Sequence, residues 1–175
     1  MAQYPNIGAG DDFVVETLRS MIPQTVTKTA TETVNNSSTY QDDDDLSGLA
    51  LGVGTWWVRM CLFMTCTTSA TPDIKTKWTF SGTATNAIRM IKGPGSTNVA
   101  SPSVITPVYL SGVPMANDAI YGLNATSTFA YAEEEVFNLT VTVAGNLTLQ
   151  WAQNTANASN TNMHAGSTVQ YRQVG

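Results

Sequence analysis

The chain is poor in charge. Of its 175 residues, 12% are Asp, Glu, Lys or Arg, about half of the ~25% that soluble domains carry. Eight basic residues against 13 acidic ones give a net charge of −5 with no basic cluster, which argues against binding nucleic acid by neutralising its phosphates. The polar surface must come from neutral side chains, and the chain has 26 Thr, 13 Asn and 13 Ser.

Long hydrophobic runs are also missing. The most apolar stretch, residues 49–66, is interrupted by Gly, Thr and Arg59, and it falls short of the ~20 residues that a membrane helix needs. Residues 1–12 have neither a basic segment nor an apolar one, so they do not resemble a secretory leader. We therefore expect no membrane partner and a protein that is made in a cytoplasm. Its length predicts one compact domain.

Histidine and cysteine, the usual residues of reactive sites, are scarce. His164 is the single histidine and lies among turn residues, so we expect an exposed loop residue and not a catalytic base. Cys61 and Cys66 would lie about 16 Å apart on opposite faces of a strand, too far for a disulfide. We expect two reduced cysteines that act as small apolar residues, with no metal site and no cofactor.

Alternating patterns of apolar and polar residues follow Thr25. In residues 55–66 one face of the predicted strand is apolar and the other is mixed, and residues 74–80 alternate in the same way. Short strands separated by turns, with no helix between them, predict an all-β protein with an antiparallel sandwich or barrel. The apolar face of residues 55–66 is predicted to comprise Trp56, Val58, Met60, Leu62, Met64 and Cys66.

Residues 135–153 read as a β-hairpin. Phe137, Leu139, Val141 and Val143 would face inward before a tight turn at Gly145-Asn146, and Leu147, Leu149 and Trp151 would face inward after it. The last strand is predicted at about 167–174. Residues 92–103 and 154–162 are predicted to be loops because Gly, Pro, Ser and Asn dominate them.

The first 24 residues differ from the rest and predict an N-terminal arm with one short helix, about residues 12–22. Asp11 or Asp12 can cap its start, and Pro23 follows as a stop. So short a helix needs a surface to pack against, and we therefore expect an attachment segment. The candidate attachment residues are Phe13, Val14, Leu18, Met21 and Ile22. Residues 25–175 would form the β domain.

Two acidic runs stand out, Asp42–Asp45 and Glu133–Glu135. For the first, repulsion between like charges favours a solvated turn over a calcium site, because the loop spacing of an EF-hand is absent. The second is expected at a rim or at an edge that its charge protects. Paired carboxylates could also serve glycoside hydrolysis, but nothing in the sequence places the two runs together.

With few residues suited to catalysis, the candidate sites are surfaces for protein contact. The C-terminal segment combines Trp151, Tyr171 and Arg172 with several amides, and large amphipathic side chains of this kind suit subunit interfaces. Trp151 has an equally good alternative as a core residue. The complete set of subunit-interface candidates is Trp57, Phe63, Trp151, Tyr171 and Arg172.

Both ends of the chain resemble a β domain of virion proteins from tailed bacteriophages, especially those that infect actinobacteria. The matching features are a helix that ends in Met21-Ile22-Pro23, a Thr-rich strand, a Ser/Thr-Thr-x-x-Asp-Asp-Asp-x-Leu turn at 38–46, a long apolar strand, and the closing segment 149–174 with its Ala-Gly-Ser turn at 165–167. Residues 70–135 have no counterpart in the resemblance.

The resemblance implies a trimeric jelly roll of the tumour-necrosis-factor type. Relatives in this family occur as head decorations and as tail tips. The favoured hypothesis is a non-enzymatic capsid decoration protein on the outer surface of the virion head, with further copies of itself and the major capsid protein as partners. The alternative is a tail-fibre or minor-tail tip that binds host-surface glycans. A 24-residue arm spans at most ~36 Å as a helix, enough for a peg on a shell but not for a fibre shaft, and this favours the decoration protein.

Overall fold

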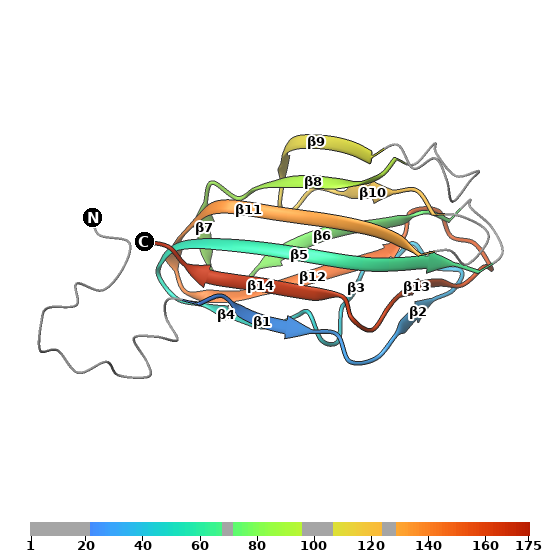
Figure 1. The fold of residues 1–175 in the computed structure, drawn as a ribbon, viewed down its shortest axis with the longest axis horizontal. Coiled ribbons are helices and arrows are strands. Elements are labelled where there is room, and N and C mark those ends of the chain that lie inside the picture. Colours follow the sequence, from blue (N-terminus) through green and yellow to red (C-terminus); the bar gives the residue numbers. More distant parts are fainter. Residues whose placement is uncertain (1–21, 68–71, 96–106, 124–128) are drawn as a thin grey trace, which may run out of the picture.

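In the computed structural model, which describes residues 22–67, 72–95, 107–123 and 129–175, every regular element is a β-strand. The strands form two antiparallel sheets, one of nine strands and one of five, packed as a sandwich (Figure 1). The predicted all-β antiparallel sandwich is therefore confirmed. The helix predicted at 12–22 lies outside the described residues, apart from Ile22.

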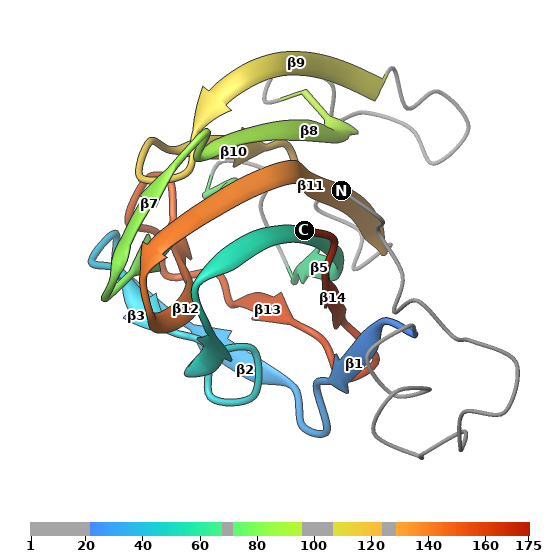
Figure 2. The ribbon, with the colours of Figure 1, turned by 90° about the vertical axis from the view of Figure 1, so that its left-hand side faces the viewer.

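The nine-stranded sheet carries the longest strands. Its central strands β5, β11 and β14 run side by side along the long axis of the molecule (Figure 1). In Figure 2, β8 and β9 lie toward one edge of this sheet and β1 at the other. Its members are β1 (Gln24–Thr27), β2 (Glu32–Val34), β5 (Gly54–Cys66), β7 (Thr83–Thr85), β8 (Ile88–Pro94), β9 (Pro107–Pro114), β11 (Ala130–Val143), β13 (Thr161–Met163) and β14 (Thr168–Gln173).

The five-stranded sheet is built around β12, which pairs with β6 on one side and with β3 and β4 on the other. β10 adds to the far side of β6. Its members are β3 (Gln41–Asp42), β4 (Leu49–Leu51), β6 (Ile74–Phe80), β10 (Ala119–Tyr121) and β12 (Gly145–Gln153).

The strand pairs are nested along the chain. β1 pairs with β14, β3 and β4 with β12, β5 with β11, and β6 with β10. A chain that doubles back on itself and rolls up in this way makes the two Greek keys of a jelly roll. Strands β8 and β9 fall between β6 and β10 in sequence and extend the nine-stranded sheet beyond β11.

The core lies between the sheets and is filled by inward positions of alternating strands. All six residues predicted on the apolar face of 55–66 are at most 7% exposed. Leu147, Leu149 and Trp151 of β12 are fully buried, as predicted. The period of two succeeds here because each of these strands has one face toward the core and one toward solvent.

The predicted hairpin at 135–153 is wrong. β11 and β12 belong to different sheets, and the chain crosses from one to the other at Ala144. Two glycines allow the crossing: a Cβ on Gly145 would lie 2.2 Å from the Gly82 nitrogen, and a Cβ on Gly82 would lie 2.2 Å from the Val143 carbonyl oxygen. The turn signal was therefore real, but it marks a change of sheet.

A bulge in β11 overturns part of the predicted inward face. The register of β11 against β5 shifts between Val136 and Leu139. Val136 and Leu139 are both buried, whereas Phe137 is 49% exposed, because the extra residue reverses which side of the strand faces the core. Val143, at the end of the strand, is also exposed. Leu139 and Val141 face inward as predicted.

The two predicted loops are partly strands. Residues 92–94 complete β8, and residues 161–163 form β13, which pairs with β2 and β5. The last strand, predicted at 167–174, is β14 at 168–173.

Candidate functional site

The outward side of the nine-stranded sheet gathers aromatic, apolar and charged side chains from four adjacent strands. We call it the aromatic face. Exposure decides its importance: Phe137, Met90 and Tyr131 are 49%, 48% and 39% exposed, unusually open for large apolar side chains. The aromatic face comprises Trp57, Arg59, Cys61 and Phe63 of β5, Tyr131, Glu133, Glu135 and Phe137 of β11, Ile88, Met90 and Lys92 of β8, and Gln170 and Arg172 of β14.

Strand register sets these side chains in rows across the sheet. One row joins Gln170, Arg59, Glu135 and Met90, and a neighbouring row places Cys61 beside Glu133. Side chains directly opposite each other on one side of a sheet lie about 5 Å apart. The aromatic face is therefore a continuous surface, made by residues far apart in the sequence.

Charged groups on the aromatic face contact one another or the Trp57 ring. Arg59 Nε lies 2.8 Å from Glu133 Oε1, and this bond raises the pKa of the arginine. Trp57 Nε1 donates to Glu135 Oε1 at 2.5 Å, and the Arg172 guanidinium lies 5.8 Å from the centre of the Trp57 ring. These contacts hold both charge signs in fixed positions among the rings.

Aromatic stacking fixes the other end of the face. The Phe63 and Tyr131 rings lie 5.6 Å apart at 51°, within the tilted geometry that aromatic pairs prefer. The Tyr131 hydroxyl donates to Cys61 Sγ at 3.2 Å. Burial, followed by this contact with Cys61, raises the pKa of Tyr131, so the phenol stays neutral and can donate.

The interface candidates from the sequence divide into two groups. Trp57, Phe63 and Arg172 all lie on the aromatic face and are half-buried, with Arg172 beside Trp57 and Phe63 at the other end. Trp151 is fully buried and Tyr171 is 8% exposed, so the core alternative holds for Trp151, and neither reaches an outer surface in this conformation. Along β12 and β14, buried and more exposed residues alternate, and Trp151 and Tyr171 occupy positions that point inward.

Sequence reasoning missed Tyr131, Phe137 and Met90. Tyr131 and Phe137 alternate with Glu133 and Glu135 along β11, so a period of two was present, but the acidic run was read as a rim. Met90 required the position of β8 beside β11, which only the fold supplies.

Two carboxylates of the first acidic run, Asp42–Asp45, lie close to the buried Lys28. The expectation of a solvated turn is wrong for Asp43, which is fully buried with its carboxylate 3.1 Å from Lys28 Nζ. Lys28 also bonds Glu32, and Asp45 lies 3.9 Å from it. Burial alone would lower the pKa of Lys28, but Glu32 and Asp43 together raise it. These carboxylates therefore neutralise a lysine.

The same carboxylates also hold the backbone of the loop. Asp43 Oδ1 accepts hydrogen bonds from the Asp45 and Leu46 amides at 3.1 and 2.8 Å, and Glu32 Oε1 accepts one from the Asp44 amide at 2.8 Å. Asp45 Oδ2 accepts from the Thr29 amide at 2.9 Å, and this bond lowers the pKa of Asp45. The run has a structural role.

The second acidic run lies within a central strand, so the predicted rim position is wrong. Glu134 is fully buried and points into the sandwich, where Oε2 lies 2.5 Å from Arg89 Nη1. Thr76 and Tyr121 of the opposite sheet donate to Oε1, the latter at 2.9 Å. Arg89 donates to the Asn117 carbonyl at 2.5 Å. This network ties the two sheets together.

His164 is half-buried at one end of the sandwich. Its Nε2 lies 2.7 Å from the Thr65 hydroxyl, and the Phe129 ring lies 4.7 Å away. Burial lowers the pKa of His164. Thr65 and Thr31 are the polar contacts of its ring, which gives the histidine a packing role instead of the exposed position that was expected.

Neither Cys61 nor Cys66 forms a disulfide bond; Cys61 is half-buried and Cys66 is buried. Among the described residues, no cluster of three or more His, Cys, Asp or Glu side chains is arranged to hold a metal ion. Within the same residues, no helix has the length and hydropathy to cross a membrane.

The attachment candidates Phe13, Val14, Leu18 and Met21 lie outside the described residues. Ile22, the fifth, is 62% exposed just before β1.

Comparison of the chain with protein-family models, curated proteins and solved structures gives no match.

Proposed function

We propose that this chain is a non-enzymatic structural protein that assembles with copies of itself through the aromatic face. The observation that carries the proposal is the composition of that face: half-exposed Trp, Phe, Tyr and Met side chains interleaved with arginine and glutamate. Interface centres are enriched in aromatic residues, Met and Arg, and contiguous exposed apolar patches mark contact surfaces.

Self-assembly suits this face better than a partner of one charge. Arg59 and Arg172 lie within the same few rows as Glu133 and Glu135, so a second copy can oppose positive groups to negative ones. Closed cyclic symmetry uses such a surface repeatedly and limits the size of the assembly. A homotrimer is the assembly that the resemblance to phage virion proteins implies.

The same resemblance, together with the short N-terminal arm, supports a place on the outer capsid surface. The N-terminal arm would contact the major capsid protein, and the β domain would project outward. A protein that binds only the assembled shell stabilises it by mass action. The low charge suits dense repetition, because neighbouring copies repel each other weakly.

The test combines mass with capsid binding. Sedimentation velocity of the full chain should give three times the 18.7 kDa chain mass. Deletion of residues 2–22 should leave a trimer but abolish its co-sedimentation with purified phage heads. A monomeric wild-type chain contradicts the assembly. Capsid binding retained by the deletion variant contradicts the attachment role, and immunogold label on tails instead of heads supports the tail-tip alternative.

A further inference from the structure

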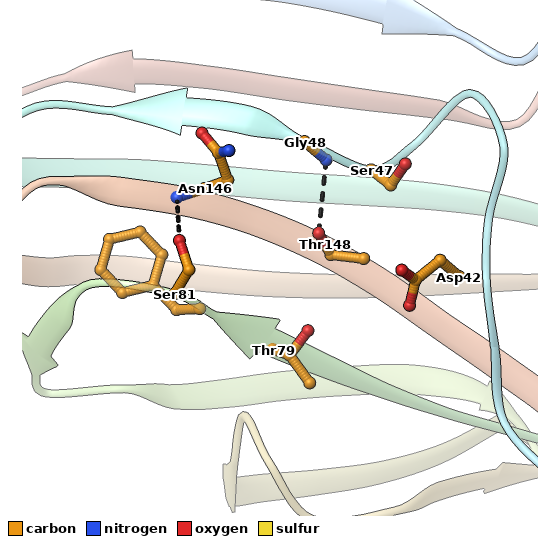
Figure 3. A pocket seen from close by; sticks show the side chains of 8 residues that line it. Asp42, Ser47, Gly48, Thr79, Ser81, Asn146 and Thr148 are labelled. Atoms are coloured by element: carbon orange, nitrogen blue, oxygen red, sulfur yellow. Dashed lines mark hydrogen bonds between the residues drawn. The ribbon is translucent and has the colours of Figure 1, made fainter.

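A second surface, on the outward side of the five-stranded sheet, holds a hollow of about 510 Å³. Figure 3 shows its polar side chains from β6, β12 and the chain around β3 and β4. Its volume falls in the range of about 300–1,000 Å³ that small-molecule sites occupy. We call it the polar pocket, and its lining comprises Asp42, Ser47, Gly48, Thr79, Phe80, Ser81, Asn146 and Thr148.

The pocket follows from how three segments meet along β12. Thr148 of β12 is the direct cross-strand partner of Thr79 of β6. On the other side, β3 and β4 both pair with β12, and residues 43–48 connect them. Backbone hydrogen bonds from Asp43 to Leu149 and from Leu149 to Leu46 fix the loop on β12. The wall of the pocket is therefore tied to its floor.

Backbone and amide donors orient the polar groups of the pocket. The Gly48 amide donates to Thr148 Oγ1 at 3.3 Å, and the Asn146 amide donates to Ser81 Oγ at 2.8 Å (Figure 3). A hydroxyl that accepts in this way keeps its own proton to donate. Gln150 Nε2 donates to Asp42 Oδ1 at 2.6 Å, which leaves Oδ2 as an acceptor.

This set of groups matches a ligand that both donates and accepts hydrogen bonds and carries no negative charge. Four hydroxyls, one amide and one carboxylate line the pocket, and none of its eight lining residues is basic. A single carboxylate is too few for a calcium ion, which takes six to eight oxygens. Phe80 borders the hollow, but it pairs with buried Leu147 and packs against the core.

We propose that the polar pocket binds a neutral saccharide unit, whose hydroxyls exchange hydrogen bonds with Thr79, Thr148 and Asp42. The pocket lies on the opposite sheet from the aromatic face, so an assembled protein would keep it open. The proposal is thus independent of the self-assembly proposed above.

The experiment is a titration of the ¹⁵N-labelled full chain, followed by amide NMR signals. The probes are the methyl glycosides of glucose, mannose, galactose and N-acetylglucosamine. We expect at least one to shift the signals of Gly48, Thr79, Asn146 and Thr148, with a dissociation constant of about 1 mM, typical of a small shallow site. Absence of localised shifts with all four overturns the proposal.

Matched variants separate the pocket from its surroundings. The double variant Asp42→Asn/Thr79→Val should weaken binding about tenfold by removing two polar contacts. Asp44→Asn/Thr85→Val, which changes the same residue types outside the pocket, should leave it unchanged, and an equal loss in this control contradicts the proposal.

Charge gives an independent readout. Methyl glucuronide should bind more weakly than methyl glucoside, because its carboxylate meets Asp42, and Asp42→Asn should narrow the difference. A glucuronide that binds as tightly as the glucoside contradicts the assignment of a neutral ligand.

Discussion

The two outward faces of the sandwich differ in chemistry although they cover the same core. The aromatic face sets rings and Met90 among an Arg59–Glu133 ion pair at 2.8 Å and a Trp57–Glu135 hydrogen bond at 2.5 Å. The opposite face presents hydroxyls, amides and lysines, and there Lys75 and Lys77 lie 4.6 and 4.1 Å from the centre of the Tyr40 ring. One face is suited to a large dry contact and the other to a small hydrated ligand.

The difference shows how a β-sandwich separates folding from function. Inward positions of β5, β6 and β12 are all apolar or hydrogen-bonded, so they determine the fold. Outward positions alternate with them and are free to vary. A role can therefore be assigned to each face only after the register places residues from distant segments side by side.

The largest expected effect concerns the buried pair of Arg89 and Glu134. Glu134 points into the core from β11, between Glu133 and Glu135, which face outward. Arg89→Met should lower the free energy of unfolding by about 3–5 kcal/mol, because it leaves Glu134 buried without its cation. Urea denaturation measures this loss. The double variant Arg89→Met/Glu134→Leu should recover much of the stability, and a single variant as stable as the wild type would show that the pair is dispensable.

The next effect concerns the aromatic face itself. Phe63→Thr/Tyr131→Thr removes the stacked pair but keeps strand-forming residues, and it should weaken self-association by at least about 2 kcal/mol, the scale of an interface hot spot. Sedimentation equilibrium measures the association constant.

The matched control for this variant is Val53→Thr/Ile120→Thr, which removes two exposed apolar side chains that are not members of the aromatic face. Its association constant should equal that of the wild type. If both double variants lose association equally, general surface hydrophobicity drives assembly and the distinction between the two faces fails.

The smallest expected effect concerns Asp73, which lies between β5 and β6 and belongs to neither face. Burial raises the pKa of Asp73 to about 6 from 3.8, against the opposing effect of the Leu123 amide, which donates to it. Between these values the folded chain holds a proton that the unfolded chain has lost. Stability contributed by this group therefore falls as the pH rises from about 4 to about 6.

Asp73→Asn should remove that pH dependence and raise stability at pH 7 by about 1 kcal/mol, after allowance for screening by nearby solvent. Thermal unfolding at several pH values measures it. Asparagine also tolerates the positive φ of 38° at this position. Because Asp73 belongs to neither face, self-association and saccharide binding should not change. A change in either would show that the site of Asp73 is coupled to one of the two faces.

The sequence was most informative where one strand has one buried side. The alternation in β5, β6 and β12 predicted their inward residues because the period of two reflects burial directly. The bulge after Val136 was not predictable, since one additional residue leaves the local composition unchanged while it turns Phe137 outward.

Long-range pairing explains the remaining differences. A tight turn at Gly145 is compatible with a hairpin or with a crossing between sheets, and only the packing against Gly82 decides between them. Likewise, Lys28 and Arg89 could not be assigned to Asp43 and Glu134, because each pair spans a separation in sequence that composition does not encode. The aromatic face was therefore predicted only through Trp57, Phe63 and Arg172.

The protection of Cys61 tests the central claim most directly, because this thiol lies on the aromatic face while Cys66 is buried in the core. Alkylation of the native wild-type chain would be followed by mass spectrometry over a concentration series. We predict that Cys61 reacts in the dilute chain and becomes protected as the mass rises to that of the assembly. A Cys61 reaction rate that stays constant while the mass rises would contradict the account.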